Sequence, residues 1–202
     1  LPSGKMKSRE GTAVDADDLM EDMFQNAKSI AEELGKIDKS QNNETNELYE
    51  TVGMGALKYF MLKVDPKKRM LFDPQESIDF NGNTGPFIQY TYARIQSILR
   101  KNNGDIKIDE DSNITDKERA LIISLLEFPK TIQEAANSFS PALIANYAYE
   151  VVKDFNSYYQ STSILGADSP SIISFRVALS QQTAKVIKSS MSLLGINVPQ
   201  RM

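Results

Sequence analysis

Aromatic and cationic side chains share one side of a helical pattern in the middle of the chain. At about 100° per residue, Phe87, Tyr90 and Arg94 fall on one stripe of that pattern. Two aromatic rings beside a guanidinium are the groups with which proteins stack unpaired bases and hold phosphates, so this stripe predicts a site for single-stranded nucleic acid. The alternative is that Phe87 and Tyr90 enlarge the hydrophobic core, because aromatic side chains are generally buried.

A basic segment near the start of the chain is the second candidate for chemistry. Lys5, Lys7 and Arg9 stand in a short stretch that is flanked by Gly4 and Gly11. From the residues alone, a charge cluster of this kind is typical of a solvated surface loop. The alternative is a loop whose cations bind phosphate groups.

Several functional classes are excluded by the composition. The 202 residues include no His and no Cys, so His-based acid–base pairs, catalytic triads, disulfides and His- or Cys-based metal sites are excluded. We therefore expect no metal site. No apolar run approaches the ~18 residues of a membrane span, and no secretory signal pattern is present. The chain is expected to fold without a membrane.

The formal charge of −4 is distributed unevenly along the chain. Residues 1–80 hold 11 Lys and Arg against 16 Asp and Glu, a net charge of −5, whereas residues 81–202 hold 12 against 11, a net charge of +1. Contacts with phosphates are local, so the near-neutral second part can bind RNA if its cations gather on one face. Net charge alone does not decide for or against nucleic acid.

A helix over residues 81–101 is needed to position the candidate stripe. Asn83 or Thr84 can cap its first turn, and Pro86 suits that turn because its missing N–H has no partner there anyway. A second stripe of this helix is apolar and is the expected core face. It consists of Ile88, Tyr92, Ile95 and Leu99.

Helical spacing and helix-start signals recur along the rest of the chain. They predict further helices that begin near Asp15, Thr45, Thr115, Ser140 and Ser169. Thr115 and Glu118 have the spacing of a capping box, and we expect their helix to lie remote from the nucleic-acid site. Residues 70–72 form a short strand at most. The whole pattern is that of an α-helical bundle.

Four stretches of the chain resemble class I arginyl-tRNA synthetases. GNTGPFIQYTYARIQSIL is similar to the helix that opens their anticodon-binding domain, whose Asp-Ala-Leu-Arg signature corresponds to residues 91–94. Lys5-Met6-Lys7-Ser8-Arg9, followed by REGT and VDADDLMEDM, resembles the KMSKS loop. The second lysine of that signature falls on Ser8, so its role passes to Lys7 or Arg9. NYAYEVVKDFNSYYQSTSIL and VIKSSMSLLGINVPQRM are similar to the later part of the domain.

The resemblance implies an all-α fold in two parts. Residues 81–202 correspond to a helical-bundle anticodon-binding domain of class I aminoacyl-tRNA synthetase type, and residues 1–80 to the helical end of the catalytic region. The chain begins Leu-Pro-Ser-Gly and already carries a motif there, so it is expected to be a piece of a longer protein. It is also expected to end where that protein ends.

The resemblance also implies roles for particular residues. The catalytic residues implied in the KMSKS-like loop are Lys5, Lys7, Ser8 and Arg9. The residues implied to bind ATP are Lys5, Met6, Lys7 and Ser8. The residues implied to contact arginine tRNA are Phe87, Tyr90, Arg94, Tyr159 and Met202. In the full-length protein the partners would be arginine tRNA, arginine, and ATP with magnesium, and the protein is expected to be a cytoplasmic monomer.

The activity implied by the resemblance is ATP-dependent attachment of arginine to its tRNA. The present chain is expected to be inactive alone and to bind no cofactor, because the HIGH-type motif of the family requires histidine. An alternative from a different functional class is a helical scaffold that binds a partner protein through its exposed aromatic side chains, without nucleic acid.

Overall fold

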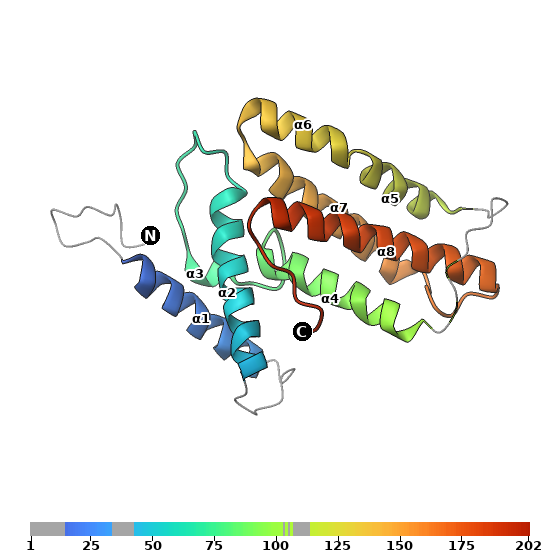
Figure 1. Ribbon diagram of the computed structural model, residues 1–202, viewed down its shortest axis with the longest axis horizontal. Helices are drawn as coiled ribbons and strands as arrows, with labels where there is room; N and C mark the ends of the chain where they lie inside the picture. Colours follow the sequence, from blue (N-terminus) through green and yellow to red (C-terminus); the bar gives the residue numbers. More distant parts are fainter. Residues whose placement is uncertain (1–14, 34–42, 103, 105, 107–113) are drawn as a thin grey trace.

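The described part of the chain folds into α-helices. The computed structural model describes residues 15–33, 43–102, 104, 106 and 114–202, and within these ranges all regular structure is helical, as expected (Figure 1). The KMSKS-like segment Lys5–Arg9 lies outside the described residues. The helices are α1 (Ala16–Glu33), α2 (Asn43–Leu62), α3 (Pro74–Ser77), α4 (Gly85–Lys101), α5 (Asp116–Leu126), α6 (Phe128–Ser138), α7 (Pro141–Ser161) and α8 (Pro170–Leu193).

The helix that carries the candidate stripe begins four residues later than the predicted range. Of the two possible caps, Thr84 is the residue used, since its Oγ1 accepts a hydrogen bond of 3.3 Å from the backbone N–H of Phe87. Asn83 instead accepts the Tyr59 hydroxyl at 2.5 Å through its Oδ1. Thr84 therefore fixes the start of α4, whereas Asn83 ties the preceding turn to α2.

The other predicted helix starts are present, with one difference in how they are capped. Thr115 and Glu118 form both hydrogen bonds of the predicted capping box at the start of α5. Ser140 and Ser169 precede α7 and α8 as predicted, but neither side chain makes a capping hydrogen bond. A proline in the first turn, where its fixed φ is already helical, marks these two starts instead.

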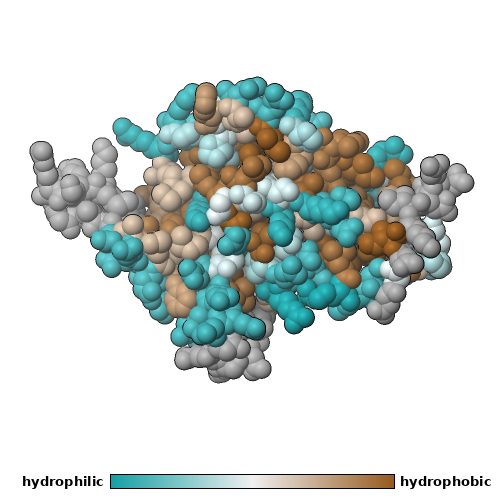
Figure 2. Space-filling view, in the orientation of Figure 1, coloured by the Kyte–Doolittle hydropathy of each residue, from teal (hydrophilic) through white to brown (hydrophobic). Residues whose placement is uncertain are grey.

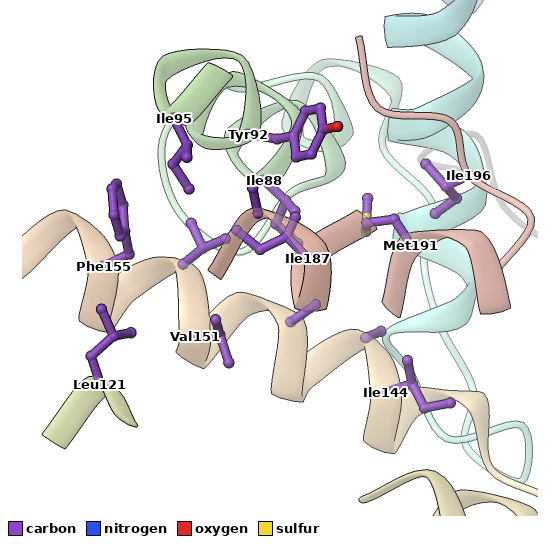
Figure 3. Close-up of a cluster of buried hydrophobic side chains, with 14 of the residues drawn as sticks. Ile88, Tyr92, Ile95, Leu121, Ile144, Val151, Phe155, Ile187, Met191 and Ile196 are labelled. Atoms are coloured by element: carbon purple, nitrogen blue, oxygen red, sulfur yellow. The ribbon is translucent and has the colours of Figure 1, made fainter. Parts of the chain in front are cut away.

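A large apolar core joins α4, α5, α7 and α8. In Figure 3 the side chains of Ile88 and Ile95 on α4 point toward Ile187 of α8 and Val151 of α7, which both lie below α4 in this view. Ile88, Ile95, Val151 and Ile187 are fully buried. Burying one such side chain contributes roughly 1.5–3 kcal/mol, so the apolar stripe of α4 is a main source of bundle stability.

A second apolar cluster lies under α1, α2 and the segment before α4. Met23 and Ala56 are fully buried there, and Phe72 packs edge-on against Phe60 at a centroid distance of 5.2 Å. Residues 70–72 form no strand. They are an irregular segment whose Phe72 side chain packs in this cluster. Helices α1 and α2 approach closely at Gly53, since a Cβ there would stand 2.7 Å from the carbonyl oxygen of Met23.

The last eight residues run along the seam between α2 and α4 (Figure 1). Lys58 Nζ of α2 donates to the Gly195 carbonyl at 2.8 Å, Gln89 Nε2 of α4 donates to Asn197 at 2.8 Å, and Arg100 Nη1 donates to Gln200 at 3.0 Å. Met202 packs against the second apolar cluster. We call residues 195–202 the C-terminal strap. The division into residues 1–80 and 81–202 stays a prediction.

Candidate nucleic-acid interface

Helices α4 and α7 bring three of the predicted site residues together. The guanidinium carbon of Arg94 lies 4.9 Å from the ring centroid of Tyr90, one turn earlier on α4. The same carbon lies 5.3 Å from the ring centroid of Tyr159, near the end of α7. A cation held near two aromatic rings keeps its position through cation–π attraction. We call Tyr90, Arg94 and Tyr159 the tyrosine–arginine cluster.

A neutral partner fixes the guanidinium of Arg94. Its Nη1 donates to Asn156 Oδ1 of α7 at 2.5 Å, and Asn156 Nδ2 in turn donates to Thr91 Oγ1 at 2.9 Å. Asn156 is buried, so this amide has a fixed orientation. Within the described residues, the cations that form ion pairs are Lys130, Lys153 and Arg176, not Arg94. The Arg94 charge is therefore oriented without being neutralised.

Further aromatic rings support the two tyrosines. Tyr90 meets Phe80 edge-on, with ring centroids 6.3 Å apart and planes at 88°. Tyr159 stacks on the fully buried Phe155, with centroids 6.1 Å apart and planes at 17°. Tyr159 is nevertheless 39% exposed, so its ring is both held by the core and reachable from solvent. Rings that are ordered in advance lose little entropy when a ligand stacks on them.

A pocket of about 510 Å³ opens beside the tyrosine–arginine cluster. Its lining includes Arg94 and Lys101 of α4, Tyr159 of α7, and the turn over residues 162–166. Lys101 was not among the predicted site residues, although it stands seven residues after Arg94 and hence within about 20° of the same stripe. Residues 162–166 were not predicted to lie at the site either, because no local pattern indicates a position next to α4. Two cations and an aromatic ring around one hollow suit a base with its phosphate.

The other two predicted contact residues have different neighbours. Phe87 is partly buried against the large core, and its ring centroid lies 6.0 Å from that of Tyr149. Met202 packs against the second apolar cluster at the end of the C-terminal strap. For Phe87, the core packing agrees with the alternative that it enlarges the core. A contact of Phe87 or Met202 with RNA stays a prediction.

The capping box of α5 is connected to this site rather than remote from it. Glu118 accepts a hydrogen bond of 2.8 Å from Arg176 Nε, and Arg176 Nη1 donates at 2.9 Å to the carbonyl of Ser163, which lines the pocket. Burial by itself raises the pKa of Glu118, but the hydrogen bonds from Thr115 and Arg176 outweigh burial and lower the pKa below its usual value. Glu118 is therefore a buried carboxylate.

The described residues lack two further features, a metal-binding cluster and a membrane-spanning helix. They contain no group of three or more His, Cys, Asp or Glu side chains that could hold a metal ion. None of their helices has the length and apolarity that crossing a membrane requires.

Comparison with known proteins gives consistent matches over the whole chain. The chain is 58% identical over 202 residues to an arginine–tRNA ligase of Flavobacterium psychrophilum, covering 100% of the chain and 34% of that protein. It is 52% identical over 207 residues to an arginine–tRNA ligase of Parabacteroides distasonis, covering 35% of that protein. The chain therefore spans about a third of the length of these relatives.

A solved structure and a family model agree with these relatives. The Thermus thermophilus arginyl-tRNA synthetase superposes with a TM-score of 0.88 at 32% identity, over 98% of this chain and 34% of that protein. The family model of the DALR anticodon binding domain matches residues 88–202, which include α4 from its first turn onward and the C-terminal strap. Because this match takes in the greater part of the sequence, the chain belongs to the DALR anticodon-binding domain family.

Proposed function

We propose that the tyrosine–arginine cluster and its pocket bind the anticodon region of an arginine tRNA. We also propose that the intact protein attaches arginine to that tRNA in an ATP-dependent reaction. The family match supports the first proposal, and the names of the relatives, arginine–tRNA ligase, support the second.

The position of Arg94 is the observation that carries the proposal. The Arg94 guanidinium lies near two tyrosine rings and is oriented by a neutral amide. It can therefore donate hydrogen bonds to a phosphate without first breaking an ion pair with a carboxylate. The neighbouring rings can stack unpaired bases, whereas a duplex would hide its bases from them. Single-stranded loops such as an anticodon loop are therefore the ligand that fits this arrangement.

The remaining parts of the proposal depend on the resemblance of the sequence. Lys5, Lys7, Ser8 and Arg9 would supply positive charge and hydrogen bonds to ATP as the α-phosphate reacts, with magnesium present. The nucleotide would contact Lys5, Met6, Lys7 and Ser8. Arginine would bind in a part of the protein that this sequence does not include. Action as a monomer in the cytoplasm also stays a prediction.

A salt titration of tRNA binding tests the proposal. The intact protein, Tyr90→Ala and Arg94→Ala are titrated with arginine tRNA at several salt concentrations. Tyr90→Ala should weaken binding by about 1–3 kcal/mol, the range for one base–aromatic stack, with little change in the salt slope. Arg94→Ala should weaken binding and also reduce the slope by roughly 0.7, the value for one phosphate of a single strand.

Arg119→Ala is the matched control, because Arg119 is an exposed cation of α5 that lies outside the proposed site. It should leave both affinity and slope near the wild-type values. The rival function, a scaffold for a partner protein, predicts weak tRNA binding that none of the three variants changes selectively. That result would contradict the proposed function.

A further inference from the structure

A buried ion pair lies behind the pocket of the proposed RNA site. Arg176 Nε of α8 and Glu118 Oε1 of α5 are 2.8 Å apart, and their side chains are 16% and 2% exposed. Removing two charges from water is costly unless their other polar atoms are also bonded. The ion pair therefore need not raise the stability of the fold. The hydrogen bonds of its other polar atoms indicate a further structural role.

The remaining atoms of the pair connect α5 to the wall of the pocket. Glu118 Oε2 accepts the backbone N–H of Thr115 at 2.7 Å and its hydroxyl at 2.9 Å, which fixes the carboxylate at the start of α5. Arg176 Nη1 donates to the carbonyl of Ser163 at 2.9 Å. Ser163 belongs to the turn over residues 162–166, which lines the same pocket as Arg94 and Tyr159.

A neighbouring residue of α5 holds the end of α7 in the same way. Lys117 Nζ donates to Ser161 Oγ at 2.8 Å and to the carbonyl of Ser157 at 3.3 Å. These acceptors lie on either side of Tyr159 in the last turn of α7. Lys117 thus holds the end of α7 that carries Tyr159. The adjacent Glu118 holds, through Arg176, the turn that follows α7.

We propose that Arg176, oriented by Glu118, is a positioning residue for RNA recognition, because it holds residues 162–166 as a fixed wall of the pocket that Arg94 and Tyr159 also line. The inference depends on the proposed function of the site. Arginine is required because its planar fork reaches a carboxylate through Nε and a carbonyl through Nη1 at once. A lysine ammonium at the end of a flexible stem can keep the ion pair but cannot reproduce this fork.

Arg176→Lys in the intact protein is the central test. It should lower the affinity for arginine tRNA by about tenfold, comparable to the loss when a residue that orients a metal ligand is changed. The melting temperature should fall by less than about 5 °C, since the charge pair is kept. Backbone amides of residues 162–166 should exchange hydrogen faster, while those of α4 should not. Arg119→Lys makes the same substitution on an exposed residue of α5 and should change none of these quantities.

Two outcomes would overturn the inference. One is wild-type tRNA affinity of folded Arg176→Lys, and the other is faster exchange spread over α5, α7 and α8 with affinity lost only in proportion to the unfolded fraction. Should Arg176→Lys fold poorly, Glu118→Gln repeats the test, because glutamine keeps the capping box but removes the charge that orients Arg176. Glu118→Gln should also loosen residues 162–166 and weaken tRNA binding.

Arg94→Ala, measured in parallel, separates this inference from the proposed function. If Arg94→Ala weakens tRNA binding and Arg176→Lys does not, the site binds RNA but Arg176 does not position it. If neither variant weakens binding, the proposed function fails as well, and the positioning role falls with it.

Discussion

Replacing Asn156 with aspartate should neutralise the Arg94 charge through an ion pair while keeping the shape of the site. Asn156 Oδ1 now accepts from Arg94 Nη1 at 2.5 Å, so a carboxylate oxygen of Asn156→Asp would take the same place and form an ion pair. The bond from Asn156 Nδ2 to Thr91 Oγ1 would be lost, and the Thr91 hydroxyl, which now donates to the Phe87 carbonyl at 3.0 Å, would rotate and donate to the new carboxylate instead. The guanidinium would stay in position, with its charge neutralised.

The expected loss follows from one phosphate contact. Losing a hydrogen bond to a charged group costs about 1.5–3 kcal/mol, which weakens tRNA binding by about 10- to 150-fold. Neutralising one cation should also reduce the salt slope by roughly 0.7 for a single strand. Between 50 and 200 mM salt, the affinity of Asn156→Asp should therefore fall by a factor about 2.6 smaller than that of the wild type.

Binding of fluorescently labelled arginine tRNA to the intact protein measures both quantities. Asn137→Asp is the matched control, because it makes the same change in net charge on an exposed face of α6. A melting curve of each variant shows whether the protein is folded at the temperature of the titration. Wild-type affinity and slope for folded Asn156→Asp would refute the reasoning, because Arg94 would then contact no phosphate.

Three further predictions concern stability. Ile95→Ala removes a fully buried side chain of α4 and should lower the free energy of unfolding by about 2–5 kcal/mol, measured by denaturant unfolding. Gly85→Ala places a Cβ against the Gly55 carbonyl and should cost about 1–3 kcal/mol in the same assay. Because the folded-state pKa of Glu118 is lowered from 4.5, its contribution to stability is present above about pH 4.5 and is lost as the pH falls through the lowered pKa. The fall in unfolding free energy between pH 5 and pH 3 should be shallower in Glu118→Gln, and an equal slope in both proteins would contradict the assignment of the lowered pKa.

Local signals in the sequence were sufficient to predict most helices. Pro86, Pro141 and Pro170 mark first turns, Thr115 with Glu118 marks another, and Gly195 has a φ of 67° just past α8. These signals work because a helix start or end depends on the few residues around it. The apolar periodicity of α4 likewise predicted its core face correctly.

The surroundings of the site could not be predicted in the same way. In the sequence, Asn156 has the pattern of an ordinary polar residue of a helix. It orients Arg94 only because α7 packs against α4. The bond from Arg176 to Ser163 depends on how α8 lies against the end of α7. Such contacts follow from tertiary packing, which local periodicity does not report. The expectation that the capping box lies far from the site failed for this reason.

The C-terminal strap has a consequence for the order of folding. Its acceptors Gly195 and Asn197 are separated by 137 and 108 residues from their donors Lys58 and Gln89. Contacts over such distances form late, because a long loop must close first. During synthesis, α2 and α4 would leave the ribosome long before the strap, and until the strap docks the Gln89 amide would have the Thr51 carbonyl but not the Asn197 carbonyl as an acceptor. Docking of the strap therefore closes the seam between α2 and α4 late in folding. If synthesis stalls before residue 195, this seam would stay exposed to chaperones and proteases.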